Sequence, residues 1–239
     1  MPGLQAVTGV ILAGGEGTRL KAVVPDRPKV LAPVRGRPFL TYLLDQLAKA
    51  GVKEVVLCTG YQAEMIEAEL GDRYKSLNLR YSREDEPLGT GGALRLALPH
   101  CSSDPILAMN GDSFLDADLM AYWSWFSEKA PDAGLLLARV ADTRRYGRVQ
   151  VREDGLILGF EEKGGASGSG WINAGIYLLR KHVLAAIPLG RPYSLESELF
   201  PPLAGKNLYG YQAAGRFIDI GTPESYREAE KFFLKVKMS

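Results

Sequence analysis

The sequence predicts an α/β protein with a mixed, mostly parallel central sheet flanked by helices. Three observations support this prediction. Short apolar segments rich in β-branched residues alternate with amphipathic segments, glycine turns join the two kinds, and no internal repeat or long linker divides the chain. Since 46% of the 239 residues are hydrophobic, the chain is long and apolar enough to bury a substantial core. We therefore expect one domain that spans residues 1–239.

In the N-terminal half, strands and helices are expected to alternate as parallel β–α–β units. Residues 7–12 are rich in valine and isoleucine, a glycine turn follows at 14–17, and leucines recur at helical spacing in 39–50. The next expected elements are a strand at 54–59, a helix at 62–70, a strand at 79–81, a helix at 92–98 and a strand at 105–109. Ligands of such sheets bind beyond the carboxyl ends of the strands. Residues 14–19 and 110–112 follow two of these strands, so we expect a site there.

The C-terminal half has shorter apolar segments, which indicate a mixed or antiparallel portion. Its expected strands cover 134–140, 147–151, 156–161 and 172–179. The Gly/Ser-rich segment 164–170 is typical of either a mobile surface connection or a lid over a ligand. Ser194 is placed to cap an amphipathic helix over 194–200, to which we assign no chemistry, and a last helix is expected over 223–235.

Two groups of aromatic residues are predicted to belong to the core. Tyr122, Trp125 and Phe126 share helical spacing, which favours packing over a platform on which a base would stack. Phe232 and Phe233 fall on the apolar side of the last expected helix.

Composition excludes several classes of protein. The formal net charge of +1 provides no general basic field, so nucleic acid is not an expected partner. No apolar run approaches the roughly 20 residues that a membrane span needs, and the first residues lack the basic region of a secretory signal. Cys58 and Cys101 are too few for a disulfide framework and are not spaced as metal ligands. We expect a soluble cytoplasmic protein, either a monomer or a homodimer.

The turn after the first expected strand is suited to binding phosphate. Glycines let main-chain N–H groups approach phosphate oxygens, and Arg19 adds a fork of donors for a polyphosphate. The turn is not a Walker loop, because no Lys-Ser/Thr pair follows its last glycine, and Leu20 stands where a dinucleotide fingerprint needs its third glycine. A purely structural turn is the alternative, which Arg19 and the later Lys29 make less favourable.

Three further charged residues are candidates, each with a structural alternative. Asp112 follows Asn-Gly and can be a simple turn residue. Asp219 lies between two isoleucines, where a carboxylate needs an ionic partner or a metal. Lys163 alone is typical of a solvated lysine. Their occurrence together with the Arg19 turn favours a functional role for all three.

Motif blocks along nearly the whole chain resemble, in order, the signature of sugar-1-phosphate nucleotidylyltransferases. They cover residues 14–20, 27–34, 86–93, 110–112, 162–163, 173–177 and 217–223. The resemblance is closest to the short bacterial guanylyltransferases that act on D-glycero-D-manno-heptose 1-phosphate. Two departures are visible: residues 22–24 are Ala-Val-Val where the family often has Pro-Leu-Thr, and Gly164 stands where a proline commonly follows the Glu-Lys pair.

The resemblance implies a Rossmann-like fold and a reaction. Residues 1–115 would form the nucleotide-binding half and residues 116–239 the half that binds sugar phosphate, with a smaller antiparallel portion. A sugar 1-phosphate oxygen would attack the α-phosphorus of a nucleoside triphosphate, GTP being favoured, and pyrophosphate would leave. The product would be an activated sugar for a cell-surface polysaccharide, such as lipopolysaccharide or an S-layer glycan. This step requires positioning, neutralisation of phosphate charge and a magnesium ion.

The resemblance also implies roles for individual residues. Arg19 would bind the β/γ-phosphates and the departing pyrophosphate, and Lys29 would bind the phosphates near the reacting phosphorus. Lys163 would bind the sugar phosphate. Asp112 and Asp219 would share Mg²⁺, whose preferred ligands are hard carboxylate oxygens. The implied nucleotide-binding residues are Leu12, Ala13, Gly14, Gly15, Gly17, Thr18, Glu86, Leu88, Gly89 and Thr90, and the implied sugar-binding residues are Tyr146, Gly147, Glu162 and Asn173.

Three points stay open at this stage. Glu86 is expected to accept the two adjacent donors of guanine, or else it is solvated and the main chain of Leu88 and Gly89 reads the base. Asn173 can be a structural amide at a strand edge. The activity can instead be that of a mannose-1-phosphate guanylyltransferase, an N-acetylmuramate-1-phosphate uridylyltransferase or a glucose-1-phosphate thymidylyltransferase. A catalytically silent regulator that binds sugar nucleotides is the alternative from another class. Such a protein would be free to lose four residues that this chain has, Arg19, Lys29, Asp112 and Asp219.

Overall fold

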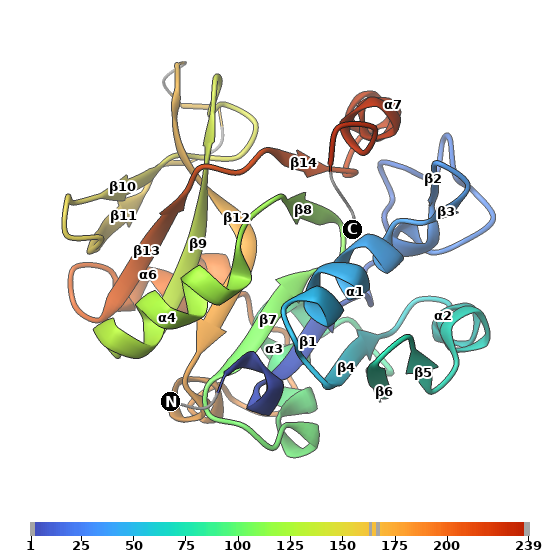
Figure 1. Ribbon diagram of the computed structural model, residues 1–239, viewed down its shortest axis with the longest axis horizontal. Coiled ribbons are helices and arrows are strands. Elements are labelled where there is room, and N and C mark those ends of the chain that lie inside the picture. Colours follow the sequence, from blue (N-terminus) through green and yellow to red (C-terminus); the bar gives the residue numbers. More distant parts are fainter. Residues whose placement is uncertain (1–2, 163, 166–167, 237–239) are drawn as a thin grey trace.

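An eight-stranded mixed sheet forms the centre of the computed structural model, which describes residues 3–162, 164–165 and 168–236 (Figure 1). Its strand order is β13-β9-β12-β7-β1-β4-β6-β5. The strands are β1 (Thr8–Leu12), β4 (Glu54–Thr59), β5 (Arg73–Tyr74), β6 (Leu77–Arg83), β7 (Ile106–Asn110), β9 (Ala133–Val140), β12 (Gly170–Leu179) and β13 (Leu208–Ala213). Strands β7, β1, β4 and β6 are parallel, whereas β12 runs antiparallel to both β7 and β9. The α/β class and the mostly parallel sheet are therefore confirmed.

Helices cover both faces of this sheet. They are α1 (Leu40–Lys49), α2 (Ala63–Leu70), α3 (Gly89–Ala97), α4 (Leu119–Lys129), α5 (Lys181–Ala185), α6 (Phe200–Leu203) and α7 (Pro223–Phe232). Short helical turns add η1 (Leu4–Ala6), η2 (Lys29–Leu31), η3 (Leu98–His100) and the π-helical turn η4 (Leu195–Leu199). Helices α1 and α4 lie on one face, and α3 lies on the other (Figure 1). Because side chains alternate along a strand, the consecutive residues Val10 and Ile11 enter the two opposite apolar clusters.

Three two-stranded ladders complete the fold. They pair β2 (Pro33–Val34) with β3 (Arg37–Pro38), β10 (Val149–Val151) with β11 (Ile157–Phe160), and β8 (Ser113–Leu115) with β14 (Phe217–Asp219). All three are antiparallel, and the β10–β11 ladder lies in the C-terminal half, where an antiparallel portion was expected. The β8–β14 ladder joins segments about a hundred residues apart in sequence, and it positions two of the predicted site residues.

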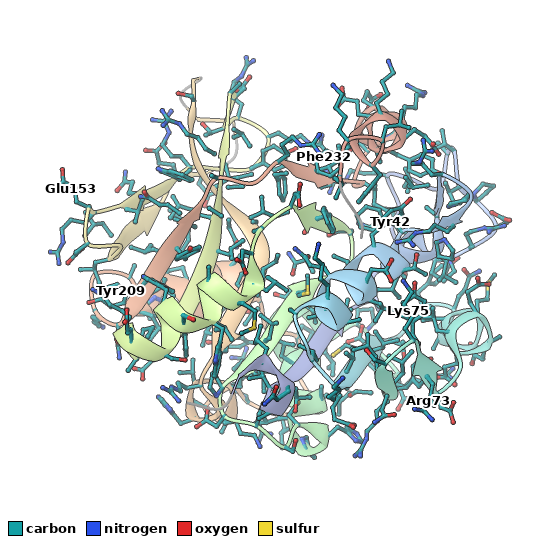
Figure 2. The ribbon with its side chains drawn as sticks, in the orientation of Figure 1. Tyr42, Arg73, Lys75, Glu153, Tyr209 and Phe232 are labelled. Atoms are coloured by element: carbon teal, nitrogen blue, oxygen red, sulfur yellow. The ribbon has the colours of Figure 1, made fainter. Side chains whose placement is uncertain are left out.

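The aromatic side chains predicted to be structural do belong to the core. Tyr122 and Phe126 of α4 are fully buried, and the Tyr122 hydroxyl donates a hydrogen bond to the carbonyl of Gly134 (2.6 Å). At the end of α7, the Phe233 ring stacks on Tyr42 of α1, with ring centroids 3.8 Å apart. Figure 2 labels Tyr42 together with Phe232, the last residue of α7.

Two helices differ from the sequence expectation. Helix α3 begins at Gly89 and not at 92, because a residue distant in sequence satisfies its first turn: the N–H groups of Gly91 and Gly92 both donate to the carbonyl of Tyr193. The helix expected at 194–200 is the π-helical turn η4 followed by α6. Ser194 caps it as predicted, but Pro201 at the start of α6 cannot donate the next helical hydrogen bond.

Within the described part of the chain, no helix is long and apolar enough to cross a membrane. Both cysteines are buried free thiols, and burial raises the pKa of Cys101 to about 11. Lys163 and residues 166–167 lie outside the described residues, so the expected phosphate role of Lys163 and the expected lid at 164–170 stay predictions.

Candidate active site

Backbone hydrogen bonds tie together the carboxyl ends of three neighbouring strands. The N–H of Ala13, just after β1, donates to the carbonyl of Cys58 on β4 (2.8 Å). The N–H of Gly111, just after β7, donates to the carbonyl of Leu12 on β1 (2.9 Å). Residues 12–19 and 110–112 therefore lie side by side at one edge of the sheet, as their positions after the strands predicted.

The glycine turn after β1 packs against two charged side chains. A Cβ atom on Gly14 would lie 2.6 Å from Oε1 of Glu84, so only glycine allows this approach. Gly17 has a φ of +62°, and a Cβ there would lie 2.7 Å from Cβ of Lys29. Gly15 differs, because its Cβ would have no neighbour within 4 Å. The turn thus leaves an open surface at Gly15, next to the exposed residues Glu16, Thr18 and Arg19.

Lys29 and Asp112 form an ion pair, although 83 residues separate them. The Nζ of Lys29, in η2, donates to Oδ2 of Asp112. The Lys29 side chain is 15% exposed and that of Asp112 is 35% exposed. Water screens this pair only partly, so it holds a positive and a negative group at one place near the glycine turn.

Asp219 lies beside the Asp112 segment through the β8–β14 ladder. Asp219 pairs in register with Ser113, and the N–H of Ile220 donates to the carbonyl of Asp112 (2.9 Å). The Asp219 side chain is only 14% exposed. The structure therefore places Asp219, at the end of β14, beside Asp112 in the turn that precedes β8. It also explains how a carboxylate persists between two isoleucines.

Three donors surround the Asp219 carboxylate. Nη2 of Arg145 and the N–H of Gly221 (2.8 Å) donate to Oδ1, and the Tyr146 hydroxyl donates to Oδ2 (2.8 Å). Burial, together with the Asp219 charge, raises the pKa of Tyr146, which keeps its hydroxyl protonated as a donor. The predicted sugar-binding residue Tyr146 is thus next to the predicted metal ligand. Arg145 was missed from the sequence; its position beside Tyr146 was the only available signal.

Arg19 approaches the same place as Arg145. A Cβ atom on Gly221 would lie 3.9 Å from Nη2 of Arg19, 3.8 Å from Nη2 of Arg145 and 2.8 Å from Oδ1 of Asp219. Among the described residues, no carboxylate forms an ion pair with Arg19, whose side chain is exposed. Its guanidinium fork therefore has unused donors at a point where phosphate charge could be neutralised.

The two carboxylates fit a magnesium ion that is shared with phosphate oxygens. Nowhere in the described ranges do three His, Cys, Asp or Glu side chains gather closely enough to hold a metal by themselves. Mg²⁺ commonly binds one or two carboxylates and completes its octahedron with water and substrate phosphates. Asp219 uses three of about four acceptor positions, and Asp112 retains its Oδ1. Asp112 and Asp219 would thus hold the ion only together with a nucleotide.

A carboxylate that was not predicted from the sequence lies just before the second predicted nucleotide-binding segment. Glu84 follows β6 directly, and its Oε2 accepts a hydrogen bond from the N–H of Leu88 (3.1 Å). Its other oxygen lies against Gly14 and Gly60. Burial raises the pKa of Glu84, while the Leu88 N–H lowers it in part. Glu86, the predicted base reader, is exposed and has no hydrogen-bonded partner among the described residues. The position of Glu84 just beyond a strand end was the signal that could have identified it.

Gly89 and Thr90 begin helix α3 beside a later segment of the chain. Gly89 has a φ of +68°, and a Cβ there would lie 2.9 Å from the carbonyl oxygen of Tyr193. The Thr90 hydroxyl donates to Oε2 of Glu196 (2.8 Å). The nucleotide-side loop is therefore packed against residues 193–196, to which the sequence assigned no chemistry.

The remaining predicted sugar-binding residues lie on β12 and in the loops that flank β10 and β11. On β12, the Asn173 amide donates to the Tyr177 hydroxyl (3.0 Å) and accepts from the N–H of Gly175 (2.9 Å). Gly147 has a φ of +78°, directly after Tyr146. Glu162 is exposed, and within the described ranges no side-chain hydrogen bond fixes it.

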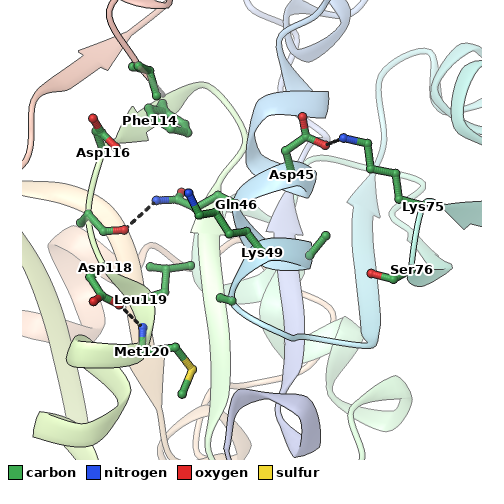
Figure 3. A pocket seen from close by; sticks show the side chains of 14 residues that line it. Asp45, Gln46, Lys49, Lys75, Ser76, Phe114, Asp116, Asp118, Leu119 and Met120 are labelled. Carbon is green, nitrogen blue, oxygen red and sulfur yellow. Dashed lines mark hydrogen bonds and ion pairs between the residues drawn. The ribbon is translucent and has the colours of Figure 1, made fainter. Parts of the chain in front are cut away.

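A separate cavity of about 700 Å³ opens between α1 and the segment after β8 (Figure 3). Asp45, Gln46 and Phe114 are among its lining residues, and it is lined by none of the predicted site residues that the structure describes. The Gln46 amide donates to the carbonyls of Leu115 (2.8 Å) and Ala117 (3.3 Å). These bonds anchor α1 to the end of β8, and so support the ladder that carries Asp112 and Asp219.

Comparison with known proteins extends over almost the whole chain. The Nucleotidyl transferase family model matches residues 8–236. The D-glycero-alpha-D-manno-heptose 1-phosphate guanylyltransferase of Aneurinibacillus thermoaerophilus is 39% identical over 223 residues, which cover 93% of this chain and 96% of that protein. The mannose-1-phosphate guanylyltransferase of Mycobacterium tuberculosis is 38% identical over 92% of this chain, but the match spans 62% of that protein.

A solved structure agrees with these matches. HddC from Yersinia pseudotuberculosis superposes with a TM-score of 0.84 at 33% sequence identity, over 95% of this chain and 99% of that one. The same protein has been solved in complex with GMP-PN, at the same TM-score and coverage.

Proposed function

This chain belongs to the nucleotidyl transferase family, and we propose on that premise that it transfers GMP from GTP to D-glycero-α-D-manno-heptose 1-phosphate. The observation that carries the proposal is the convergence of Lys29, Asp112 and Asp219 at the carboxyl edge of the sheet, beside the glycine turn. Relatives similar over nearly their whole length are named for this reaction. The chain is therefore a sugar-1-phosphate guanylyltransferase by family and by the composition of its site.

In this reaction, an oxygen of the sugar 1-phosphate forms a bond to the α-phosphorus of GTP. The bond from that phosphorus to the β-phosphate oxygen breaks, and pyrophosphate leaves with the electron pair. The protein must align the sugar phosphate, the α-phosphate of GTP and the departing pyrophosphate, and it must neutralise their charge. Arg19 is free to bind the departing pyrophosphate, and Lys29 is held by Asp112 near the glycine turn. Mg²⁺ held by Asp112 and Asp219 would neutralise further phosphate charge when bound.

Two carboxylates of one loop are candidates for reading guanine, which offers N1–H and an amino group side by side. Uracil and thymine offer one N–H between two carbonyl oxygens, so a carboxylate would be repelled. We favour Glu84 over the sequence-predicted Glu86, because Glu84 is half-buried against Gly14 and is oriented by the Leu88 N–H. Reading by a buried carboxylate is the more selective, since a mismatch leaves its charge unpaired.

The test is a matrix of pyrophosphate-release assays. GTP, ATP, CTP, UTP and dTTP are each combined with the 1-phosphates of D-glycero-α-D-manno-heptose, mannose, glucose and N-acetylmuramate, with and without Mg²⁺. We expect the largest kcat/KM for GTP with the heptose 1-phosphate and a requirement for the metal. A preference for UTP or dTTP would contradict guanylyl transfer. Absence of turnover with every pair would favour the silent regulator that binds sugar nucleotides.

Further expectations accompany this function. We propose one domain, in which residues 1–115 bind the nucleotide and residues 116–239 bind the sugar phosphate. We propose a cytoplasmic location, where nucleoside triphosphates are available, and a monomer or homodimer. Cell fractionation and light scattering of the purified protein test these two expectations directly.

A further inference from the structure

A chain of hydrogen bonds crosses between the nucleotide side and the sugar side of the site, and Glu196 is at its centre. Glu196 lies in η4, the π-helical turn Leu195–Leu199. On one side it meets Thr90 at the start of α3, and on the other it meets Tyr177 of β12. Tyr177 in turn contacts Asn173. Two residues predicted to bind different substrates are therefore connected through one carboxylate.

Among the described residues, every side chain that is hydrogen-bonded to Glu196 is a donor. The hydroxyls of Thr90 (2.8 Å) and Ser194 (3.2 Å) donate to Oε2, and the Tyr177 hydroxyl donates to Oε1 (3.2 Å). An ionised carboxylate is the side chain suited to this position, because it accepts on both oxygens and donates on neither. A glutamine of the same shape would present one oxygen and one N–H₂ group to the same donors.

The acceptor at Glu196 fixes the direction of the whole chain. Tyr177 has a single hydroxyl proton, which it gives to Glu196, so its oxygen must accept from Nδ2 of Asn173 (3.0 Å). Oδ1 of Asn173 accepts from the N–H of Gly175 (2.9 Å). The amide therefore cannot flip without breaking both bonds. Asn173 is left with one N–H and one lone pair for a substrate, in a fixed orientation.

Local backbone structure holds both ends of this chain. The register of β12 against β9 shifts between Asn173 and Tyr177, so Asn173 is the last paired residue before an irregular stretch of the strand. Gly175, within this irregular stretch, has a φ of +75°, and a Cβ there would lie 2.7 Å from the Ser113 hydroxyl. At the other end, the N–H of Leu195 donates to the Thr90 hydroxyl (2.8 Å), which fastens η4 to α3. Tyr177 is fully buried, so water does not replace its partners.

We propose that Glu196 is a positioning residue that fixes the hydrogen-bonding orientation of Asn173, and thereby selects among epimeric sugar 1-phosphates. The proposal rests on the proposed function, because it concerns the sugar side of that same site. Through Thr90, Glu196 also links the sugar side to the start of the nucleotide-binding helix. Binding of a nucleotide at the start of α3 is therefore expected to favour the orientation of Asn173 described above.

The test compares Glu196→Gln with Glu198→Gln. Glu198 lies in the same η4 turn and accepts from the N–H of Ser194 (2.8 Å), but within the described residues it has no bond to Thr90 or Tyr177. For each variant, kcat and KM are measured with heptose, mannose and glucose 1-phosphates. Binding of the same three sugars is measured by calorimetry in the presence of a non-hydrolysable GTP analogue. We expect Glu196→Gln to weaken binding of the preferred sugar by about tenfold, the effect of leaving the buried Tyr177 hydroxyl with a mismatched partner, and to narrow the ratio of the affinities for mannose and glucose 1-phosphate. For Glu198→Gln, the affinity for the preferred sugar should stay within about twofold of the wild-type affinity.

A second variant shows whether Glu196 acts through Tyr177. Tyr177→Phe removes the link and leaves the carboxylate in place, so it should lower sugar selectivity as Glu196→Gln does. The double variant should then be no worse than either single variant, because all three break the same chain. The proposal would be overturned if the losses of sugar affinity in the two single variants multiplied in the double variant. It would also be overturned if Glu196→Gln kept the wild-type ratio of affinities for mannose and glucose 1-phosphate. Thermal unfolding of each variant identifies any loss that arises from misfolding.

The two failures can be told apart. If wild type binds a sugar 1-phosphate selectively and Glu196→Gln abolishes that selectivity without any turnover, the proposed function fails and the role of Glu196 stands. If wild type turns over and Glu196→Gln keeps its selectivity, only the role of Glu196 fails. If wild type neither binds nor converts any of the sugars, both are contradicted.

Discussion

At the scale of single residues, the site pairs each of its two predicted metal-binding carboxylates with a cation before any substrate binds. Lys29 holds Asp112, and Arg145 holds Asp219. These pairs keep four charges partly buried without leaving any of them unpaired, which would be costly. They also keep the carboxylates in place for a metal that arrives with the nucleotide. Substitutions here should therefore affect turnover more than folding.

Asp112→Asn and Asp219→Asn should each fold and lose about 10²–10³-fold in kcat, the usual effect of removing one preorganised charge. Both variants keep a side chain of the same size that can still accept a hydrogen bond. Turnover at limiting Mg²⁺ and thermal unfolding are the measurements. Near-native turnover in either variant would show that its carboxylate does not hold the metal.

Arg19→Ala should lower kcat by a similar order, about 10²–10³-fold, because its guanidinium is placed to meet charge on the departing pyrophosphate. Its side chain is exposed and has no carboxylate partner among the described residues, so the unfolding temperature should change little. Arg19→Lys should restore only part of the rate, since an ammonium group lacks the planar fork. Full activity of the Arg19→Ala variant would show that Arg19 is an ordinary turn residue with no role in the reaction.

Glu84→Gln and Glu86→Gln form a matched pair that locates the base-reading carboxylate. Glu84→Gln should narrow the kcat/KM preference for GTP over UTP by about tenfold or more, the cost of a buried polar mismatch. Glu86→Gln should leave that preference unchanged. Burial raises the pKa of Glu84, so its ionised fraction falls as the solution is acidified, and the KM for GTP should rise on the acid side. The opposite pattern would return the role to Glu86.

At the scale of elements, the turn after β1 uses its glycines in two different ways. Gly17 has a positive φ and lies against the Lys29 side chain, whereas Gly15 has open space around its Cβ position. One glycine is therefore needed by the fold, and the other leaves room for a ligand. The distinction is not visible in the sequence, where both are equivalent members of one motif.

Gly17→Ala should lower the free energy of unfolding by about 1–3 kcal/mol, because its backbone is strained for any residue with a Cβ. It should also lower turnover, since the new methyl group displaces Lys29. Gly15→Ala should fold as wild type and weaken GTP binding alone. Chemical denaturation and calorimetric titration with a GTP analogue separate the two effects. Equal losses of stability in both variants would contradict this division.

At the scale of the whole molecule, the sheet and one small ladder assemble a site from distant segments. Strands β1 and β7 bring the glycine turn beside residues 110–112, and the β8–β14 pair adds Asp219. The contact between α3 and residues 193–196 then joins the two predicted halves of the chain. Each junction is made by backbone pairing or by hydrogen bonds between distant segments, so the site depends on the complete fold.

Local patterns in the sequence were sufficient to determine the α/β class, most strands of the sheet and the edge at which the candidate residues gather. Periodicity and glycine turns act over a few residues, and the position after a strand follows from topology. Arg19, Lys29, Asp112 and Asp219 could be named because their residue types and neighbours are unusual. Which charges meet was decided only by the tertiary structure. Arg145 on Asp219, Glu84 at Gly14 and Glu196 between Thr90 and Tyr177 depend on packing between segments far apart in sequence, and no local pattern encodes that packing.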